Sequence, residues 1–194
     1  MKKFLTALIA LLIMSAQVEA IPFSKEQLDR IFIDVESAQS TSTLNLNVAT
    51  LKEKFNGLIT PILQETMQTN DVSAMEHLFL INNKDSKVFS KPDGDTFANI
   101  FGDYRVALVG LTEPNGGNFK ILSLYYTTPE ERDESLFTVW LLTAFVKSIS
   151  PDIDPQALMN ELTAENSSGS TVKAGIKFSI AADGNLNVLT ATAQ

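Results

Sequence analysis

The sequence predicts an α+β domain, in which a largely antiparallel sheet of about six or seven strands carries helices packed on one face. Three observations support this prediction. Apolar residues recur at helical spacing near the start and in the middle of the chain. Several strand-like segments are joined by short turn sequences, which is typical of antiparallel hairpins. The helical and strand-like segments come in blocks, which favours a two-layer α+β arrangement.

The first twenty residues have the pattern of a cleaved bacterial signal peptide. Two lysines precede an apolar core at 4–14, and the segment ends on Ala20. This core is too short to span a bilayer, because a spanning helix needs about 20 apolar residues. We therefore expect cleavage after Ala20, a periplasmic or secreted protein, and no stable membrane insertion afterwards. Residues 21–194 would then form a single domain.

Composition excludes several classes of function. The 194-residue chain contains no cysteine, which excludes disulfides, thiol catalysis and thiolate metal sites. Its formal charge is −8, and loss of Lys2, Lys3 and Glu19 with the leader would make it −9. Nucleic-acid binding depends on neutralising phosphates, so we expect no nucleic-acid partner.

Two helices are expected in the N-terminal part of the chain. Residues 21–46 should hold the first helix and a polar connection, with Ser24 and Gln27 forming a capping box. The second should be capped near Asn47 and continue past Pro61 as one kinked helix. The apolar residues at helical spacing are Leu28, Ile31, Phe32 and Val35 in the first helix, and Leu51, Phe55, Leu58 and Ile62 in the second.

Five strands are expected next, at 75–82, 86–90, 96–101, 104–111 and 119–126. In the first of them, His77 would lie on a sheet face. The fourth is apolar on both faces and should be an interior strand. Asn115 and Gly116 tolerate the positive backbone angles of a tight turn, which predicts a hairpin between the last two strands.

The C-terminal part should contain a helix and a hairpin. Asp154 is a suitable cap and Pro155 suits the first helical position. Residues 172–180 alternate apolar with polar or small residues, which predicts one half-buried strand. Asp183 and Gly184 would make the turn to the last strand.

The segment "TTPEERDESLFTVWLLTAF", residues 127–145, could be an acidic active site, a membrane segment or the start of a buried helix. We favour the third interpretation. Thr128 can cap, Pro129 suits the first helical position, and Glu131 completes a capping box. A helix that is apolar on all sides belongs under other elements, so we expect Trp140 in the core.

The remaining chemistry in the sequence is sparse. His77 is the single histidine, and a local structural role for it is favoured. The segments 92–95, 151–154 and 182–185 resemble calcium loops but lack the required ligand pattern. Asn166 begins a glycosylation acceptor pattern. We assign no catalytic, cofactor-binding or metal residues and expect no cofactor.

These observations favour an exported, non-catalytic domain that binds an unknown protein or small ligand through a sheet face or loop rim. One alternative is a carboxylate-dependent hydrolase of the cell envelope, which would need two acids about 5–10 Å apart in a cleft. Another is a structural subunit of an assembly. The sequence leaves the strand order open.

Overall fold

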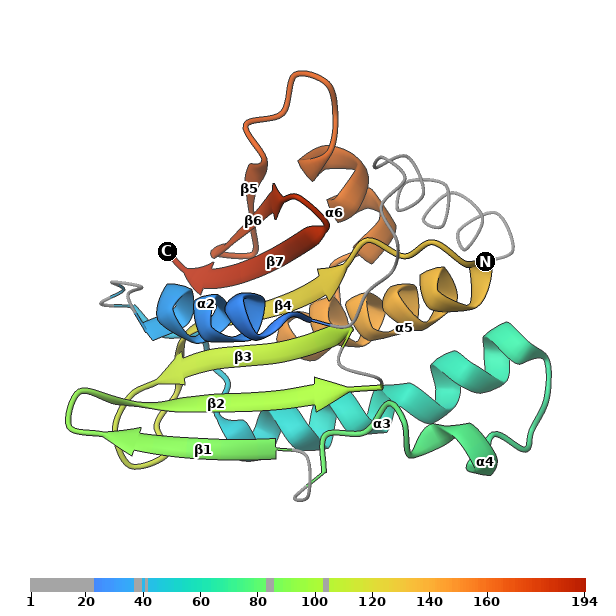
Figure 1. The fold of residues 1–194 in the computed structure, drawn as a ribbon, viewed down its shortest axis with the longest axis horizontal. Coiled ribbons are helices and arrows are strands. Elements are labelled where there is room, and N and C mark those ends of the chain that lie inside the picture. Colours follow the sequence, from blue (N-terminus) through green and yellow to red (C-terminus); the bar gives the residue numbers. More distant parts are fainter. Residues whose placement is uncertain (1–22, 37–39, 41, 83–85, 103–104) are drawn as a thin grey trace.

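The structure is a computed structural model that describes residues 23–36, 40, 42–82, 86–102 and 105–194. The expected signal peptide at 1–20 therefore lies outside the described residues. Seven strands form one sheet in the order β1-β2-β3-β4-β7-β6-β5 (Figure 1). All neighbouring strands in it are antiparallel. The predicted α+β class and the antiparallel sheet are confirmed.

The helices and strands alternate in blocks along the chain. The helices are α2 (Lys25–Glu36), α3 (Val48–Met67), α4 (Ser73–Glu76), α5 (Arg132–Ile149) and α6 (Pro155–Leu162). The strands are β1 (Ser86–Lys91), β2 (Gly94–Phe101), β3 (Val106–Thr112), β4 (Phe119–Thr127), β5 (Ser170–Lys173), β6 (Ile176–Asp183) and β7 (Leu186–Ala193). Among the described helices, none is long and apolar enough to cross a membrane.

Both N-terminal helices begin at the predicted caps. The Gln27 backbone N–H donates to Ser24 Oγ at 3.1 Å, and the Gln27 side chain accepts from the Ser24 N–H at 2.9 Å. The Thr50 N–H donates to Asn47 Oδ1 at 2.9 Å at the start of α3. Helix α3 continues through Pro61 as a single helix, as predicted. Its buried residues are Leu51, Phe55, Ile59 and Leu63, whereas Leu58 and Ile62, which were expected to face inward, are only partly buried.

Helices cover both faces of the sheet. The buried apolar residues of α3, α5 and α6, including Phe55 and Phe145, belong to the larger apolar cluster with Leu108 and Leu124 of the sheet. Helix α2 lies across the other face of β3 and β4, where its Ile31 joins a smaller cluster (Figure 1). The expected layer of helices on one face is therefore present, and α2 adds a cover on the opposite face.

The paired strands β3 and β4 lie in the interior of the sheet. β3 is buried on both faces along most of its length, as its apolar sequence predicts. Asn115 and Gly116 have φ angles of 61° and 73° in the connection to β4, which confirms the predicted tight turn.

The prediction of a strand at 75–82 is wrong. This segment contains the end of α4 and a series of turns, and His77 is exposed at the end of that helix instead of lying on a sheet face. Phe79 is buried against two aromatic rings of α5, and Ile81 exchanges two backbone hydrogen bonds with the Asn56 side chain. Each buried apolar residue therefore has its own helical neighbour, so the alternation does not reflect strand pairing.

The prediction of a single strand at 172–180 is also wrong. Ala174 and Gly175 adopt φ angles of 51° and 74°, and this tight turn divides the segment into β5 and β6. Val172 is consequently exposed on the edge strand, while Phe178 is fully buried. The sheet reaches seven strands because β5 replaces the strand predicted at 75–82.

Helices α5 and α6 confirm most of what the sequence predicts for them. α5 is buried on nearly all sides, and Trp140 is only 6% exposed, as expected of a core aromatic residue. The start of α5 differs, because the helix begins at Arg132 and not directly after Thr128. Asp154 caps α6 by accepting from the Gln156 N–H at 2.9 Å, with Pro155 in the first turn.

Candidate interaction surface

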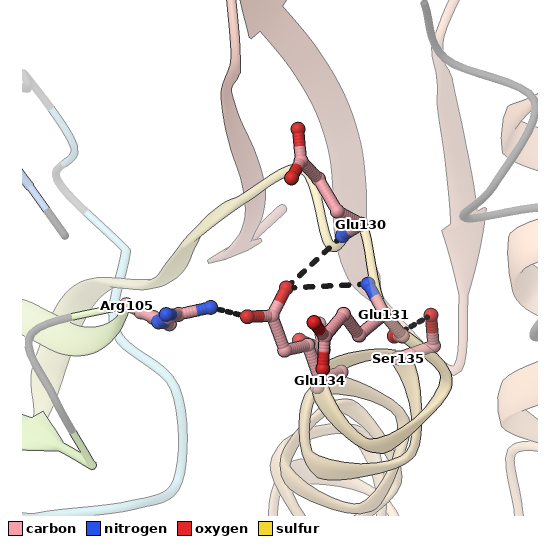
Figure 2. A network of polar contacts seen from close by, with 6 residues as sticks. Arg105, Glu130, Glu131, Glu134 and Ser135 are labelled. Atoms are coloured by element: carbon pink, nitrogen blue, oxygen red, sulfur yellow. Dashed lines mark hydrogen bonds and ion pairs between the residues drawn. The ribbon is translucent and has the colours of Figure 1, made fainter. Parts of the chain in front are cut away.

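The acidic cluster ahead of α5 closes the start of that helix. The Glu134 carboxylate accepts the backbone N–H groups of Glu130 at 3.0 Å and Glu131 at 3.4 Å, and it forms an ion pair with Arg105 (Figure 2). The Ser135 hydroxyl donates to the Glu131 carbonyl at 3.0 Å. These contacts satisfy N–H groups that the helix itself leaves unpaired and tie α5 to the segment just before β3.

Thr128 does not cap α5. Its backbone N–H donates to the Asn185 carbonyl at 2.7 Å, and its hydroxyl oxygen accepts from the Asn187 side chain at 2.9 Å. Thr128 therefore fastens the end of β4 to the β6–β7 hairpin. The capping box lies three residues further along the chain than predicted, with Glu131 as the N-cap and Glu134 as the residue that accepts its backbone N–H.

The other polar candidates from the sequence have local roles. Within the described residues, no group of three or more His, Cys, Asp or Glu side chains could hold a metal ion. Asp95, in one of the calcium-like segments, is buried and accepts the Gly116 N–H at 3.0 Å, which links two hairpin turns. Asn166 lies exposed in the connection after α6.

One polar side chain inside the core was not anticipated. Asn99 of β2 is 0% exposed, and neither atom of its amide has a hydrogen-bond partner in the part of the chain that the structure describes. The Nε1 atom of Trp140 is likewise buried without a partner there. Because these atoms are buried, they are not exposed to a ligand at the surface.

Within the described part of the chain, the clearest surface feature is β1, the strand at one end of the sheet. This strand pairs with β2 on one side only, and five of its six residues are exposed. Its two large apolar residues, Val88 and Phe89, are 51% and 48% exposed. The β1–β2 register has no bulge to twist the edge away. An edge strand of this kind can pair with another chain.

Helix α2 extends this apolar edge. The rings of Phe32 and Phe89 pack edge to face with their centroids 6.1 Å apart. Ile33, the next residue of α2, is 64% exposed and is the most exposed large apolar residue among those the structure describes. We refer to Phe32, Val88 and Phe89 together as the β1-edge surface.

The opposite edge of the sheet is better protected. β5 has only four residues, and α6 lies beside it. Lys173 of β5 forms a 2.6 Å ion pair with Glu161 of α6, and Thr171 also donates to that carboxylate. The two edges therefore differ, and β1 is the longer and more apolar of the two.

Sequence reasoning alone could not identify the β1-edge surface. The segment 86–90 was correctly predicted as a strand, but whether a strand lies at an edge depends on the strand order of the whole sheet. Comparisons with protein-family models, with curated proteins and with solved structures found no match.

Proposed function

We propose that this protein is an exported, non-catalytic interaction domain that binds an extended segment of a partner protein at β1. The observation that supports this proposal is the β1-edge surface, where the end strand of the sheet carries half-exposed Val88 and Phe89. An added strand would hydrogen-bond to the backbone along the outer side of β1, and its side chains would cover these two apolar residues.

A protein segment suits this surface better than a small ligand. Small ligands are usually held in concave sites that surround most of their surface. The β1-edge surface is instead a line of backbone donors and acceptors flanked by Phe89 on one face of the sheet and Val88 on the other. Another strand is the structure that matches both the hydrogen-bonding groups and the alternating side chains.

Export is the second part of the proposal, and it rests on the leader pattern at 1–20. N-terminal sequencing of the protein recovered from outside the cytoplasm should begin at Ile21. A sequence that begins at Met1 would contradict cleavage. Recovery of the intact chain from the cytoplasm alone would contradict export.

No observation favours the carboxylate-dependent hydrolase. A general acid in such an enzyme needs a raised carboxyl pKa. At two exposed carboxyl groups, hydrogen bonds act in the opposite direction: the backbone N–H of Glu26 and the Ser24 hydroxyl lower the pKa of Glu26, and the Lys173 ammonium and the Thr171 hydroxyl lower the pKa of Glu161. These exposed groups are suited to remain ionised.

A displayed library of random peptides can test strand addition at β1. We expect selection on the wild-type protein to enrich peptides with alternating apolar residues, and Val88→Asp to abolish their binding. Val172→Asp is the matched control, because it places the same charge on the other edge of the sheet. Far-ultraviolet circular dichroism should show that both variants remain folded. Peptides that bind Val88→Asp as well as wild type would refute the proposed site.

A further inference from the structure

We infer that β1 also pairs with β1 of a second copy of this chain, giving a two-fold symmetric dimer with a sheet continuous across both copies. This inference rests on the proposed function, because it names a partner for the same edge. The residue order of β1, SKVFSK, favours this pairing when the strand is placed antiparallel to itself.

The two-fold axis restricts the possible registers. In an antiparallel pair, directly opposite residues lie on the same face of the sheet. When Val88 lies on the axis, it faces Val88 of the second copy, Lys87 faces Phe89, and Ser86 faces Ser90. On the face that carries Val88, apolar and neutral side chains therefore meet their own kind across the axis.

The neighbouring register is less favourable. When Phe89 lies on the axis, Val88 of one copy faces Ser90 of the other. The exposed valine would then lose its apolar partner across the pair. The sequence of β1 therefore selects the register centred on Val88.

The same register covers the exposed apolar residues. On one face of the sheet, each Val88 side chain packs against its symmetry mate. On the face that carries α2, the two Phe89 rings become diagonal neighbours about 7–8 Å apart, a separation that aromatic side chains bridge. Phe32 already touches Phe89 within each copy, so the two rings from each copy would form one aromatic cluster.

Symmetry also favours β1–β1 pairing over β1–β5 pairing. Pairing β1 with β5 of another copy would leave free edges at both ends and continue into an open chain of molecules. β5 is also occupied in part by its contacts with Glu161 of α6. Pairing of β1 with itself closes the assembly at two copies and leaves both β5 edges at the ends of the sheet.

Sedimentation equilibrium of the purified protein over a range of concentrations tests the dimer. We expect the mass to rise from one chain to twice that value. Val88→Asp should remain at one chain, whereas Val172→Asp should dimerise like wild type. A wild-type protein with the mass of one chain throughout would overturn the dimer, as would loss of the dimer in Val172→Asp alone. Peptide binding by a monomeric wild type would still support the proposed function.

Single cysteine variants test the register, because the chain has no cysteine of its own. Mild oxidation should convert Val88→Cys into a covalent dimer, since directly opposite residues approach within the Cα separation that a disulfide allows. Phe89→Cys should cross-link much more slowly. Faster cross-linking of Phe89→Cys would overturn the register centred on Val88.

Discussion

Replacing Phe79 by alanine should strongly destabilise the protein. Phe79 is 1% exposed, and its ring centroid lies 4.6 Å from that of Phe137 and 5.4 Å from that of Trp140. Truncating a buried Phe to Ala costs about 3–5 kcal/mol, and aromatic pairs add about 0.5–1.5 kcal/mol beyond burial. The two ring contacts place the expected loss near 4 kcal/mol.

Urea unfolding followed by the fluorescence of Trp140, the single tryptophan, is a direct assay. With a slope of about 2 kcal/mol per M, the midpoint should fall by about 2 M. Leu78→Ala is the matched control, because this neighbouring side chain is exposed and should change stability by about 0.5 kcal/mol or less. Equal midpoints for the two variants would refute the placement of Phe79 between the helices.

Three further outcomes follow from buried or paired polar groups. Asn99→Leu should stabilise the protein by about 1–3 kcal/mol, because it removes an unpaired buried amide, and a lower melting temperature would contradict this. A double-mutant cycle of Arg105→Met with Glu134→Gln should give a coupling energy of about 1 kcal/mol, and a value near zero would show that the ion pair does not stabilise α5. Burial raises the pKa of Tyr126 above its usual value near 10, so stability should fall as the pH rises above about 10, where the unfolded chain ionises first. Tyr126→Phe should weaken that fall in alkaline unfolding measurements, and an unchanged alkaline transition would exclude Tyr126 as its cause.

Local signals predicted the elements whose stability is decided by their own sequence. The capping pairs at Ser24 and Asn47 were readable because a cap and its partner lie three residues apart. The central position of Trp140 followed from a segment that is apolar on every side of a helix. The turn at Asn115 was readable because few residues tolerate its backbone angles.

The errors arose where distant contacts decide the local structure. Alternation around Phe79 resembles a strand, but the two buried residues of that segment satisfy separate contacts with α3 and α5. Residues 172–180 alternate so regularly that the tight turn at Ala174 was hidden, since alanine is an unusual residue at a positive φ angle. The start of α5 moved because Thr128 is used by the β6–β7 hairpin.

The candidate site could not be derived from the sequence for a related reason. Val88 and Phe89 are ordinary strand residues, and their exposure depends on β1 having no second neighbour. β1 lies at one end of the sheet because the C-terminal strands join at β4, which pairs with β7, and continue to β5 at the other end.

The β4–β7 pairing also has a consequence for how the chain acquires its structure. β4 ends at Thr127 and its neighbour β7 begins at Leu186, so this largely buried strand pairs on one side with residues about sixty positions later in the chain. Until β7 has paired with it, β4 is an exposed edge of a four-stranded sheet. Contacts between such distant segments form slowly, and exposed strands aggregate meanwhile. Pairing of β7 with β4 is therefore the folding step that removes this exposed edge.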